Sequence, residues 1–118
     1  MKIQQIRNAT IIIEYAGKRI LVDPMLGEKG SFAPFPLSNH QELRNPLHDL
    51  PVKAEVIVSN IDCVLLTHLH LDHIDDAAYK LLNKQVHIFV QDKQDRNTVM
   101  SHGFTHVEII GEDSRFGD

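Results

Sequence analysis

The chain has 118 residues, of which 42% are hydrophobic and 24% are charged, and its formal net charge is −4. This length suits one domain, and the composition is that of a globular rather than a disordered protein. The negative charge argues against a nucleic-acid partner, and no apolar stretch approaches the roughly 20 residues that cross a bilayer. We therefore expect a soluble protein without a nucleic-acid or membrane partner.

The chain has a single cysteine, Cys63, which excludes an internal disulfide and suits a reducing compartment. The N-terminus also lacks the apolar core of a signal peptide, so we expect a cytoplasmic location. Cys63 stands at the start of an apolar run. We expect a buried, inert thiol, with a reactive thiol as the alternative.

The first quarter of the chain has the pattern of β-strands. Residues 2–6 alternate weakly, and residues 10–15 (TIIIEY) are rich in β-branched side chains. A turn signal, Ala16-Gly17-Lys18, separates them from residues 19–22 (RILV), so residues 10–22 are predicted to form a β-hairpin. Asp23-Pro24 then ends the second strand, because proline cannot continue a ladder.

Residues 25–52 contain four prolines and show no sustained period of either a strand or a helix. A loop of this length inside a compact domain is unusual unless it has a function. We interpret it as a lid or substrate loop, with a plain surface insertion as the alternative. His40 and His48 lie in this loop, and they either serve such a lid or are solvated.

From residue 54 onward the chain has an α/β pattern. Residues 54–59 are ambiguous, and residues 62–66 have the apolar character of a buried strand. A helix is predicted next, with Asp75 and Asp76 in its first turn, where carboxylates favour the helix dipole. Its apolar residues fall three and four apart, which is the stripe of an amphipathic helix. They are Ile74, Ala77, Ala78, Leu81 and Leu82.

The last third of the chain predicts a strand, a helix and a further strand. Residues 86–90 form the first strand, and residues 105–110 form the second. Between them, Asp92 is a suitable N-cap for a polar helix that runs to about residue 101. Gly103 stands where such a helix would stop.

The stretch THLHLDH, residues 67–73, places three imidazoles and a carboxylate directly after the predicted strand 62–66. In an extended segment His68, His70 and Asp72 project to one side, and His73 joins them only if the chain turns at the following helix. Four such close neighbours cannot easily surround one ion, so we expect His68 and His70 on one metal and Asp72 and His73 on a second. By composition alone, such a match arises in roughly three of a thousand chains, which disfavours four merely solvated groups.

The residues His68-Leu69-His70-Leu71-Asp72-His73 resemble the H-x-H-x-D-H signature of the metallo-β-lactamase superfamily. The setting is similar as well, because a hairpin, the strand end Leu21-Val22-Asp23-Pro24, a strand into the motif and a helix behind it surround the signature. The chain is most similar to the lactonase-like branch of small metal-dependent hydrolases. This resemblance implies an αββα sandwich and a metal-bound hydroxide that attacks an ester, lactone, amide or phosphodiester.

The resemblance also implies roles for individual residues. His68 and His70 would hold the first metal, while Asp72 and His73 would hold the second. Asp72 would also orient the nucleophile, which makes it the predicted catalytic residue, and Asp23 would lie close to the metals without binding them. Zinc is the expected divalent metal, with manganese or iron as alternatives, because all three accept histidine and carboxylate.

The chain departs from the superfamily in its length, since members are longer and take further ligands from their second half. Downstream of the motif only His87, His102 and His106 remain, and none has a carboxylate spaced like the missing one. We therefore expect residues 1–118 to form a single partial domain. It would be the N-terminal half of the sandwich, an α/β unit with a mixed sheet and helices on one face, truncated and weakly active or inactive.

Two other readings remain open. The chain could be a non-catalytic metal-binding half-domain that folds by self-association, because a lone half would expose one face of its sheet. Its partner would then be a second copy, as in a homo-oligomer, or the missing second half. A di-iron redox protein of the same fold is disfavoured, because that branch has Glu after H-x, whereas His70 keeps the H-x-H pattern intact here.

Overall fold

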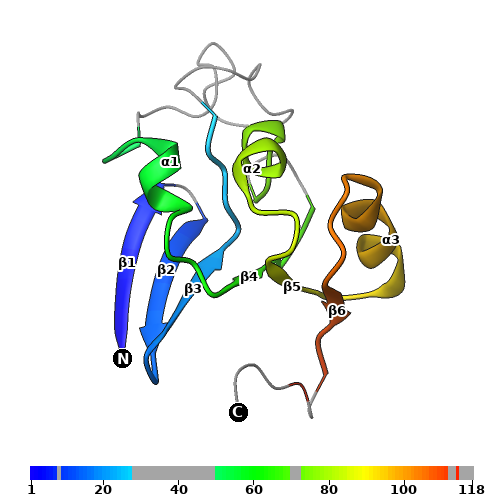
Figure 1. Cartoon of the computed structure of the whole chain (residues 1–118). Coiled ribbons are helices and arrows are strands. Elements are labelled where there is room, and N and C mark those ends of the chain that lie inside the picture. Colours follow the sequence, from blue (N-terminus) through cyan, green and yellow to red (C-terminus); the bar gives the residue numbers. More distant parts are fainter. Residues whose placement is uncertain (8, 28–49, 70–72, 112–113, 115–118) are drawn as a thin grey trace, which may run out of the picture.

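The computed structural model describes residues 1–7, 9–27, 50–69, 73–111 and 114. Within these residues, six strands form one sheet in the order of the sequence (Figure 1). The antiparallel part comprises β1 (Lys2–Arg7), β2 (Thr10–Tyr15) and β3 (Lys18–Val22). Parallel pairing then joins β3 to β4 (Cys63–Leu65), β5 (His87–Val90) and β6 (Val107–Ile109).

The predicted hairpin over residues 10–22 is confirmed as β2 and β3. Its two-residue loop, Ala16-Gly17, has φ angles of 52° and 77°. Both values lie in the left-handed region, as the tight turn of a two-residue hairpin requires, and glycine adopts it without steric cost. The loop fixes the register, so that Ile12 pairs with Leu21.

The described part of the chain has three helices: α1 (Ala54–Ile57), α2 (Asp76–Leu81) and α3 (Lys93–Ser101). Each lies between two neighbouring parallel strands in the sequence. Because such crossovers are right-handed and all proceed in the same direction along the sheet, the helices cover the same face (Figure 1). The predicted mixed sheet with helices on one face is confirmed.

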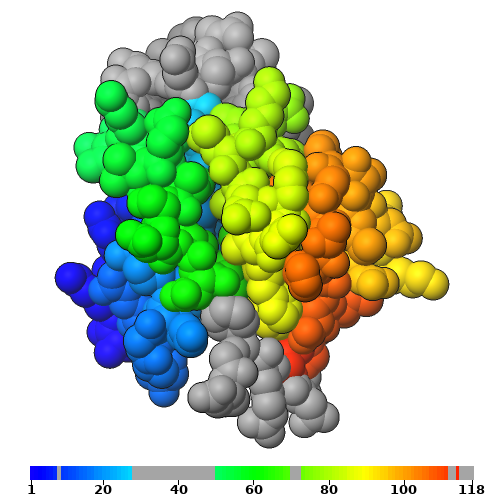
Figure 2. Space-filling model, in the orientation of Figure 1, coloured from blue at the N-terminus to red at the C-terminus, as the bar shows by residue number. Residues whose placement is uncertain are grey.

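The core lies between this face of the sheet and the helices. One apolar residue from each of five strands pairs with the next, which gives a continuous buried row. The row consists of Ile12, Leu21, Val64, Ile88 and Val107. The helices and their ends contribute Ile57, Ala78, Leu82, Val99 and Phe104 to the same cluster. Figure 2 shows the molecule from this side, where the segments of α1 and α2 lie over the sheet.

The opposite face of the sheet is also apolar at its antiparallel end. Ile3 pairs with Ile13 and Ile13 with Ile20, so these three residues alternate with the buried row and project to the other side. Ile3 is 58% exposed, and Tyr15, which shares this face, is 61% exposed. In the part of the chain that the structure describes, no helix covers this face.

The ends of the helices agree closely with the sequence prediction. Asp92 caps α3 by accepting a hydrogen bond from the amide of Asp95 at 2.8 Å, and Gly103 beyond the helix has a φ of 98°. Asp75, which we expected in the first turn of α2, is instead its N-cap. The ambiguous residues 54–59 contain the short helix α1.

The predicted loop lies largely beyond the described ranges. Of the predicted loop 25–52, residues 28–49 fall outside them, so its function as a lid stays a prediction. Among the described helices, none is both long enough and apolar enough to cross a membrane.

Candidate metal centre

The motif lies at the carboxyl end of the parallel strands, beside the end of β3. Val22 pairs with Leu65, and the amide of Asp23 donates to the carbonyl of Leu65 at 3.0 Å. Thr67 and His68 follow soon after β4, with only Leu66 between the strand and Thr67. The parallel pairing of β3 with β4 therefore places Asp23 next to residues that are more than forty positions away in the sequence.

The Asp23 side chain is the centre of a hydrogen-bond network. Its Oδ1 accepts from the amide of Thr67 at 2.7 Å, and its Oδ2 accepts from the Thr67 hydroxyl at 2.5 Å. The same Oδ2 lies 2.9 Å from Nδ1 of His73. Asp23 is only 2% exposed, and these contacts satisfy a buried carboxylate that would otherwise be costly.

The backbone of Asp23 adopts an uncommon conformation, with a φ of 47°. Aspartate tolerates the left-handed region better than most residues, but the conformation still needs support from its surroundings. Thr10 provides it, since its hydroxyl donates to the Asp23 carbonyl at 2.6 Å and accepts from the Met25 amide at 2.9 Å. Thr10 is completely buried, so this turn is fixed from within the core.

Asp75 connects the same turn to α2. Its carboxylate accepts from three backbone amides: Leu26 at 3.0 Å, Gly27 at 2.7 Å and Ala78 at 3.0 Å. Asp75 is 1% exposed, so the three bonds are shielded from water. The start of α2, which follows His73 closely, is thereby held against the segment that follows Asp23.

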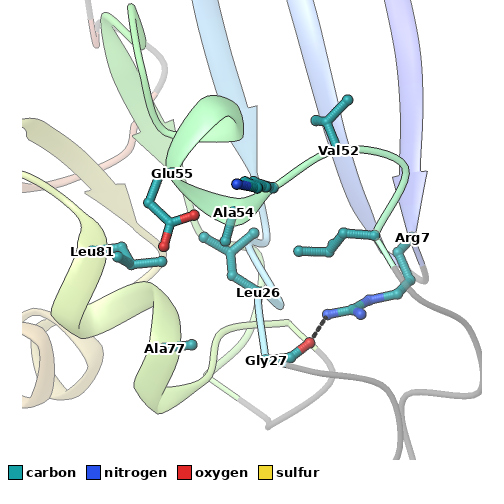
Figure 3. A pocket seen from close by; sticks show the side chains of 10 residues that line it. Arg7, Leu26, Gly27, Val52, Ala54, Glu55, Ala77 and Leu81 are labelled. Atoms are coloured by element: carbon teal, nitrogen blue, oxygen red, sulfur yellow. Dashed lines mark hydrogen bonds between the residues drawn. The ribbon is translucent and has the colours of Figure 1, made fainter.

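Arg7 secures the other side of that segment. Its guanidinium donates to the carbonyls of Met25 and Gly27, both at 2.7 Å. Arg7 also borders a cavity of about 340 Å³ between α1 and α2, where Figure 3 shows it reaching Gly27. Among the described residues of the motif, neither His68 nor His73 lines that cavity.

Of the four predicted ligands, the structure describes His68 and His73. Their rings lie side by side, with centroids 4.8 Å apart and planes inclined by 54°. His70 and Asp72 fall outside the described residues. Among the described residues there is no group of three or more His, Cys, Asp or Glu that could hold a metal, so the ligand set stays a prediction.

The donors that are described fit a divalent metal. A metal-binding histidine usually donates its second ring N–H to a carboxylate or carbonyl, which fixes the ring and leaves the first nitrogen for the metal. His73 has this arrangement, because its Nδ1 faces Asp23 and its Nε2 is then the ring nitrogen without a proton. His68 and His73, together with His70 and Asp72, are the residues that would hold the ion.

His40 and His48 fall outside the described residues, whereas His87, His102 and Cys63 have other surroundings than the motif. His102 stacks on Tyr79 with ring centroids 3.6 Å apart, and His87 stacks on Phe89 at 4.5 Å. Cys63 is a free thiol that is 2% exposed. Its burial, and secondly the negative charge of Asp62, raise its pKa to about 11, which agrees with the inert thiol expected from the sequence.

Comparison with known proteins identifies the family. Residues 5–114 match the metallo-beta-lactamase superfamily. The chain belongs to this superfamily. The resemblance predicted from the H-x-H-x-D-H signature is therefore confirmed. The chain spans about half the length of the relatives described below.

Several relatives of this metallo-beta-lactamase chain are known by sequence. It is 48% identical to the UPF0173 protein YddR of Bacillus subtilis strain 168, over 98% of this chain and 46% of the relative. It is 26% identical to the UPF0173 metal-dependent hydrolase SSO0099 of Saccharolobus solfataricus, over 70% of this chain and 29% of that protein. An N-acyl-phosphatidylethanolamine-hydrolyzing phospholipase D of Caenorhabditis elegans is 30% identical over 70% of this chain and 22% of its own length.

Solved structures agree with the sequence relatives. The isothiocyanate hydrolase from Delia radicum gut bacteria superposes with a TM-score of 0.91 and 42% identity, over 98% of this chain and 44% of that one. A possible metal-dependent hydrolase from Veillonella parvula superposes with a TM-score of 0.93 and 37% identity, over 97% of this chain and 44% of that one. The fold is therefore that of metallo-hydrolases.

Proposed function

We propose that this chain carries the H-x-H-x-D-H half of the active site of a hydrolase that uses a divalent metal, with zinc as the metal. His68 and His70 would bind one ion, and Asp72 and His73 would bind the second. The observation that carries the proposal is the 2.9 Å contact between His73 Nδ1 and the buried Asp23 carboxylate. A histidine that served only as a surface group would not need this fixed orientation.

The protein's own residues prepare this site for a metal. Asp23 holds a proton on Nδ1 of His73, so that Nε2 of this ring can act as a ligand. Asp75 and Arg7 keep the turn that carries Asp23 in place. A bound divalent ion would lower the pKa of its water toward neutrality and polarise the oxygen of the scissile group. Asp72 is the proposed residue for orienting the attacking water.

The proposed reaction is the attack of water on an electrophilic carbon or phosphorus, as in an ester, a lactone or a phosphodiester. The relatives support this range, since one is described as an isothiocyanate hydrolase and another as a phospholipase D. An isothiocyanate also has an electrophilic carbon that water can attack. A substrate panel should therefore contain a lactone, a phosphodiester and an isothiocyanate.

We also propose that the remaining ligands come from outside these 118 residues. This is supported by the 44–46% of their length that the most similar relatives share with the chain. The second half of a longer chain is the favoured source, and a second copy of this chain in a homo-oligomer is the other. A cytoplasmic location and the absence of nucleic-acid and membrane partners stay predictions from the sequence.

Metal analysis tests the proposed ligands directly. The purified chain is loaded with zinc, dialysed, and analysed for metal as wild type, as the double variant His68→Ala/His73→Ala and as His106→Ala. His106 is an exposed histidine away from the motif, so its variant controls for the loss of any imidazole. We expect up to about one retained ion per chain in wild type and in the control, and much less in the double variant, which lacks one ligand of each proposed ion. Equal metal content in all three would contradict the assignment.

Substrate tests separate the hydrolase from the alternative of a non-catalytic half-domain. His73 could bind zinc while the metal-loaded protein with a completed site hydrolyses no member of the panel. That result would favour the hypothesis of a non-catalytic half-domain. Turnover that disappears in Asp72→Ala supports the hydrolase. Self-association is the second candidate. It is supported by the exposed apolar residues Ile3 and Tyr15 on the face of the sheet that no described helix covers.

A further inference from the structure

Thr67 stands between the Asp23 carboxylate and both described histidines. Its hydroxyl oxygen lies 2.5 Å from Asp23 Oδ2, 3.2 Å from His68 Nδ1 and 3.3 Å from His73 Nδ1. Three of these four atoms belong to groups that can either donate or accept a hydrogen bond. The positions of their protons therefore depend on one another.

The Asp23 carboxylate determines where the proton of the Thr67 hydroxyl lies. An ionised carboxylate only accepts, and it takes the single hydroxyl proton of Thr67 across the 2.5 Å contact. The Thr67 oxygen then has lone pairs left but no proton to give. Its contact with His68 Nδ1 is therefore a hydrogen bond only if His68 carries a proton on Nδ1 and donates it.

The opposite assignment is unfavourable. If Thr67 donated to His68, its oxygen and the Asp23 Oδ2 would face each other at 2.5 Å with no proton between them. His73 raises no conflict, because its Nδ1 is closer to Asp23, at 2.9 Å, than to Thr67, at 3.3 Å. Both rings thus carry the proton on Nδ1, so that Nε2 is the ring nitrogen without a proton.

We propose that Thr67 is a positioning residue that selects the metal-binding tautomer of His68. Its hydroxyl donates to Asp23, and it can therefore only accept a hydrogen bond from Nδ1 of His68. The buried Asp23 carboxylate thereby determines the tautomers of both histidines. It acts on His73 directly and on His68 through the Thr67 hydroxyl. The inference matters because His68 is exposed, and an exposed histidine in water favours the tautomer with its proton on Nε2. That proton would block Nε2 as a ligand. The role in metal binding rests on the proposed function, whereas the tautomer does not.

Nitrogen-15 NMR of the metal-free chain tests the tautomer without any metal or substrate. Long-range proton–nitrogen spectra are recorded at about pH 8, above the ordinary histidine pKa, and His68→Gln and His73→Gln assign the two rings. We expect wild type to show Nδ1–H on both. Thr67→Val, which has a similar shape but no hydroxyl, should return His68 to the Nε2–H form and leave His73 unchanged. Thr67→Ser should resemble wild type.

Zinc titration against a competing chelator gives the second readout. Loss of a hydrogen bond behind a ligand typically weakens metal binding, and we expect about a tenfold loss for Thr67→Val but little change for Thr67→Ser. A His68 ring with Nε2–H in wild type overturns the inference without any variant, and so does an unchanged His68 tautomer in Thr67→Val. If the tautomers are as expected but the completed protein hydrolyses nothing, the proposed function fails while this inference stands.

Discussion

The Asp23 carboxylate serves two residues of the motif at once, since it accepts from Thr67 through both of its oxygens and lies against His73 through one. Such sharing makes the orientation of the histidines depend on a residue that precedes them by about fifty positions. It also explains why the turn at Asp23 is held by Thr10 despite its left-handed φ. The strained backbone places the carboxylate where the motif needs it.

Replacement of Asp23 should therefore lower the affinity for metal more than it lowers the stability of the fold. Asp23→Asn keeps the size of the side chain, but the amide can no longer accept on both sides. We expect zinc affinity to fall roughly tenfold to a hundredfold, measured by competition with a chelator. Asp62→Asn is the matched control, because Asp62 accepts one backbone hydrogen bond from Arg19 away from the motif. Equal affinities for the two variants would contradict this role of Asp23.

The buried thiol of Cys63 predicts a loss of stability at alkaline pH. Its pKa is raised from the ordinary 9.0 to about 11 in the folded chain, mainly by burial. Between these values the folded state binds more protons than the unfolded state, so the free energy of unfolding falls as the pH rises through this range. The contribution is fully present below about pH 9 and is lost by about pH 11.

This contribution can be measured by urea unfolding at several pH values. Wild type should lose stability more steeply than Cys63→Ala between pH 9 and 11, by at most about 1.4 kcal/mol per pH unit. The comparison of slopes removes the effect of lysines and tyrosines, which titrate in both proteins. Parallel slopes would show that Cys63 does not titrate as its burial predicts.

At the scale of the elements, Asp75 caps α2 and also binds the segment after β3. The cap bond to Ala78 resembles the cap that Asp92 gives to α3, but Asp92 is exposed and accepts from the Asp95 amide. Asp75 accepts from Leu26 and Gly27 in addition. One side chain thus holds together the two segments that carry Asp23 and His73.

The two caps predict unequal costs of substitution. Asp92→Ala should lower the free energy of unfolding by about 1 kcal/mol, as expected for an exposed N-cap. Asp75→Ala also leaves the amides of Leu26 and Gly27 without their acceptor, so we expect a loss of roughly 3 kcal/mol. Urea unfolding of both variants provides the measurement. Similar losses would mean that water replaces the two buried bonds.

The sequence predicted the elements well because their signals are local. The apolar stripe of α2, the Asp92 cap and the hairpin turn at Ala16-Gly17 all lie within a few residues of the structure that they specify. The H-x-H-x-D-H motif is equally local, and its neighbour Asp23 was found through the family resemblance.

The support of the site was missed because it consists of long-range contacts. Arg7, Thr10 and Asp75 bind backbone groups that lie from three to forty-nine positions away, and all but one of these groups are at least thirteen positions away. Backbone acceptors and donors have no residue type that a sequence pattern could reveal. Thr67 directly precedes the motif in the sequence, but only the structure shows that its hydroxyl contacts Asp23 and His68.

At the scale of the whole molecule, the described helices cover one face of the sheet, and none of them covers the opposite face. Ile3 and Tyr15 on that second face are 58% and 61% exposed, and Ile13 and Ile20 between them are half-buried. Association would remove this apolar surface from water. The partner that we propose is either the second half of a longer chain or a second copy.

The isolated 118-residue chain should therefore associate in solution. Light scattering is expected to show a dimer or a larger species. Ile3→Lys together with Tyr15→Lys should shift the chain toward the monomer, because both charges would have to be desolvated in the interface. Val56→Lys is the matched control, since Val56 is 56% exposed on α1, on the other side of the sheet. A monodisperse wild-type monomer would contradict the proposal.

The proposed site also needs residues from outside this chain for catalysis. Hydrolysis requires ligands that hold the metal and the attacking water in a fixed arrangement, and a misplacement of about 1 Å can cost on the order of a hundredfold in rate. The motif supplies four proposed ligands, and we propose that others lie outside this chain. We therefore expect the chain alone to hydrolyse lactone, phosphodiester and isothiocyanate probes no faster than free metal does.

A complementing second half should restore turnover, whether it is fused to the chain or added as a separate polypeptide. In the restored protein Asp72→Ala should abolish activity, whereas Asp92→Ala, at the cap of α3, should leave it largely unchanged because this residue lies outside the motif. Zinc content measured on the same samples distinguishes a lost metal from a misplaced one. Rapid turnover by the 118-residue chain alone would mean that its own copies complete the site, so that self-association rather than a second half provides the remaining ligands.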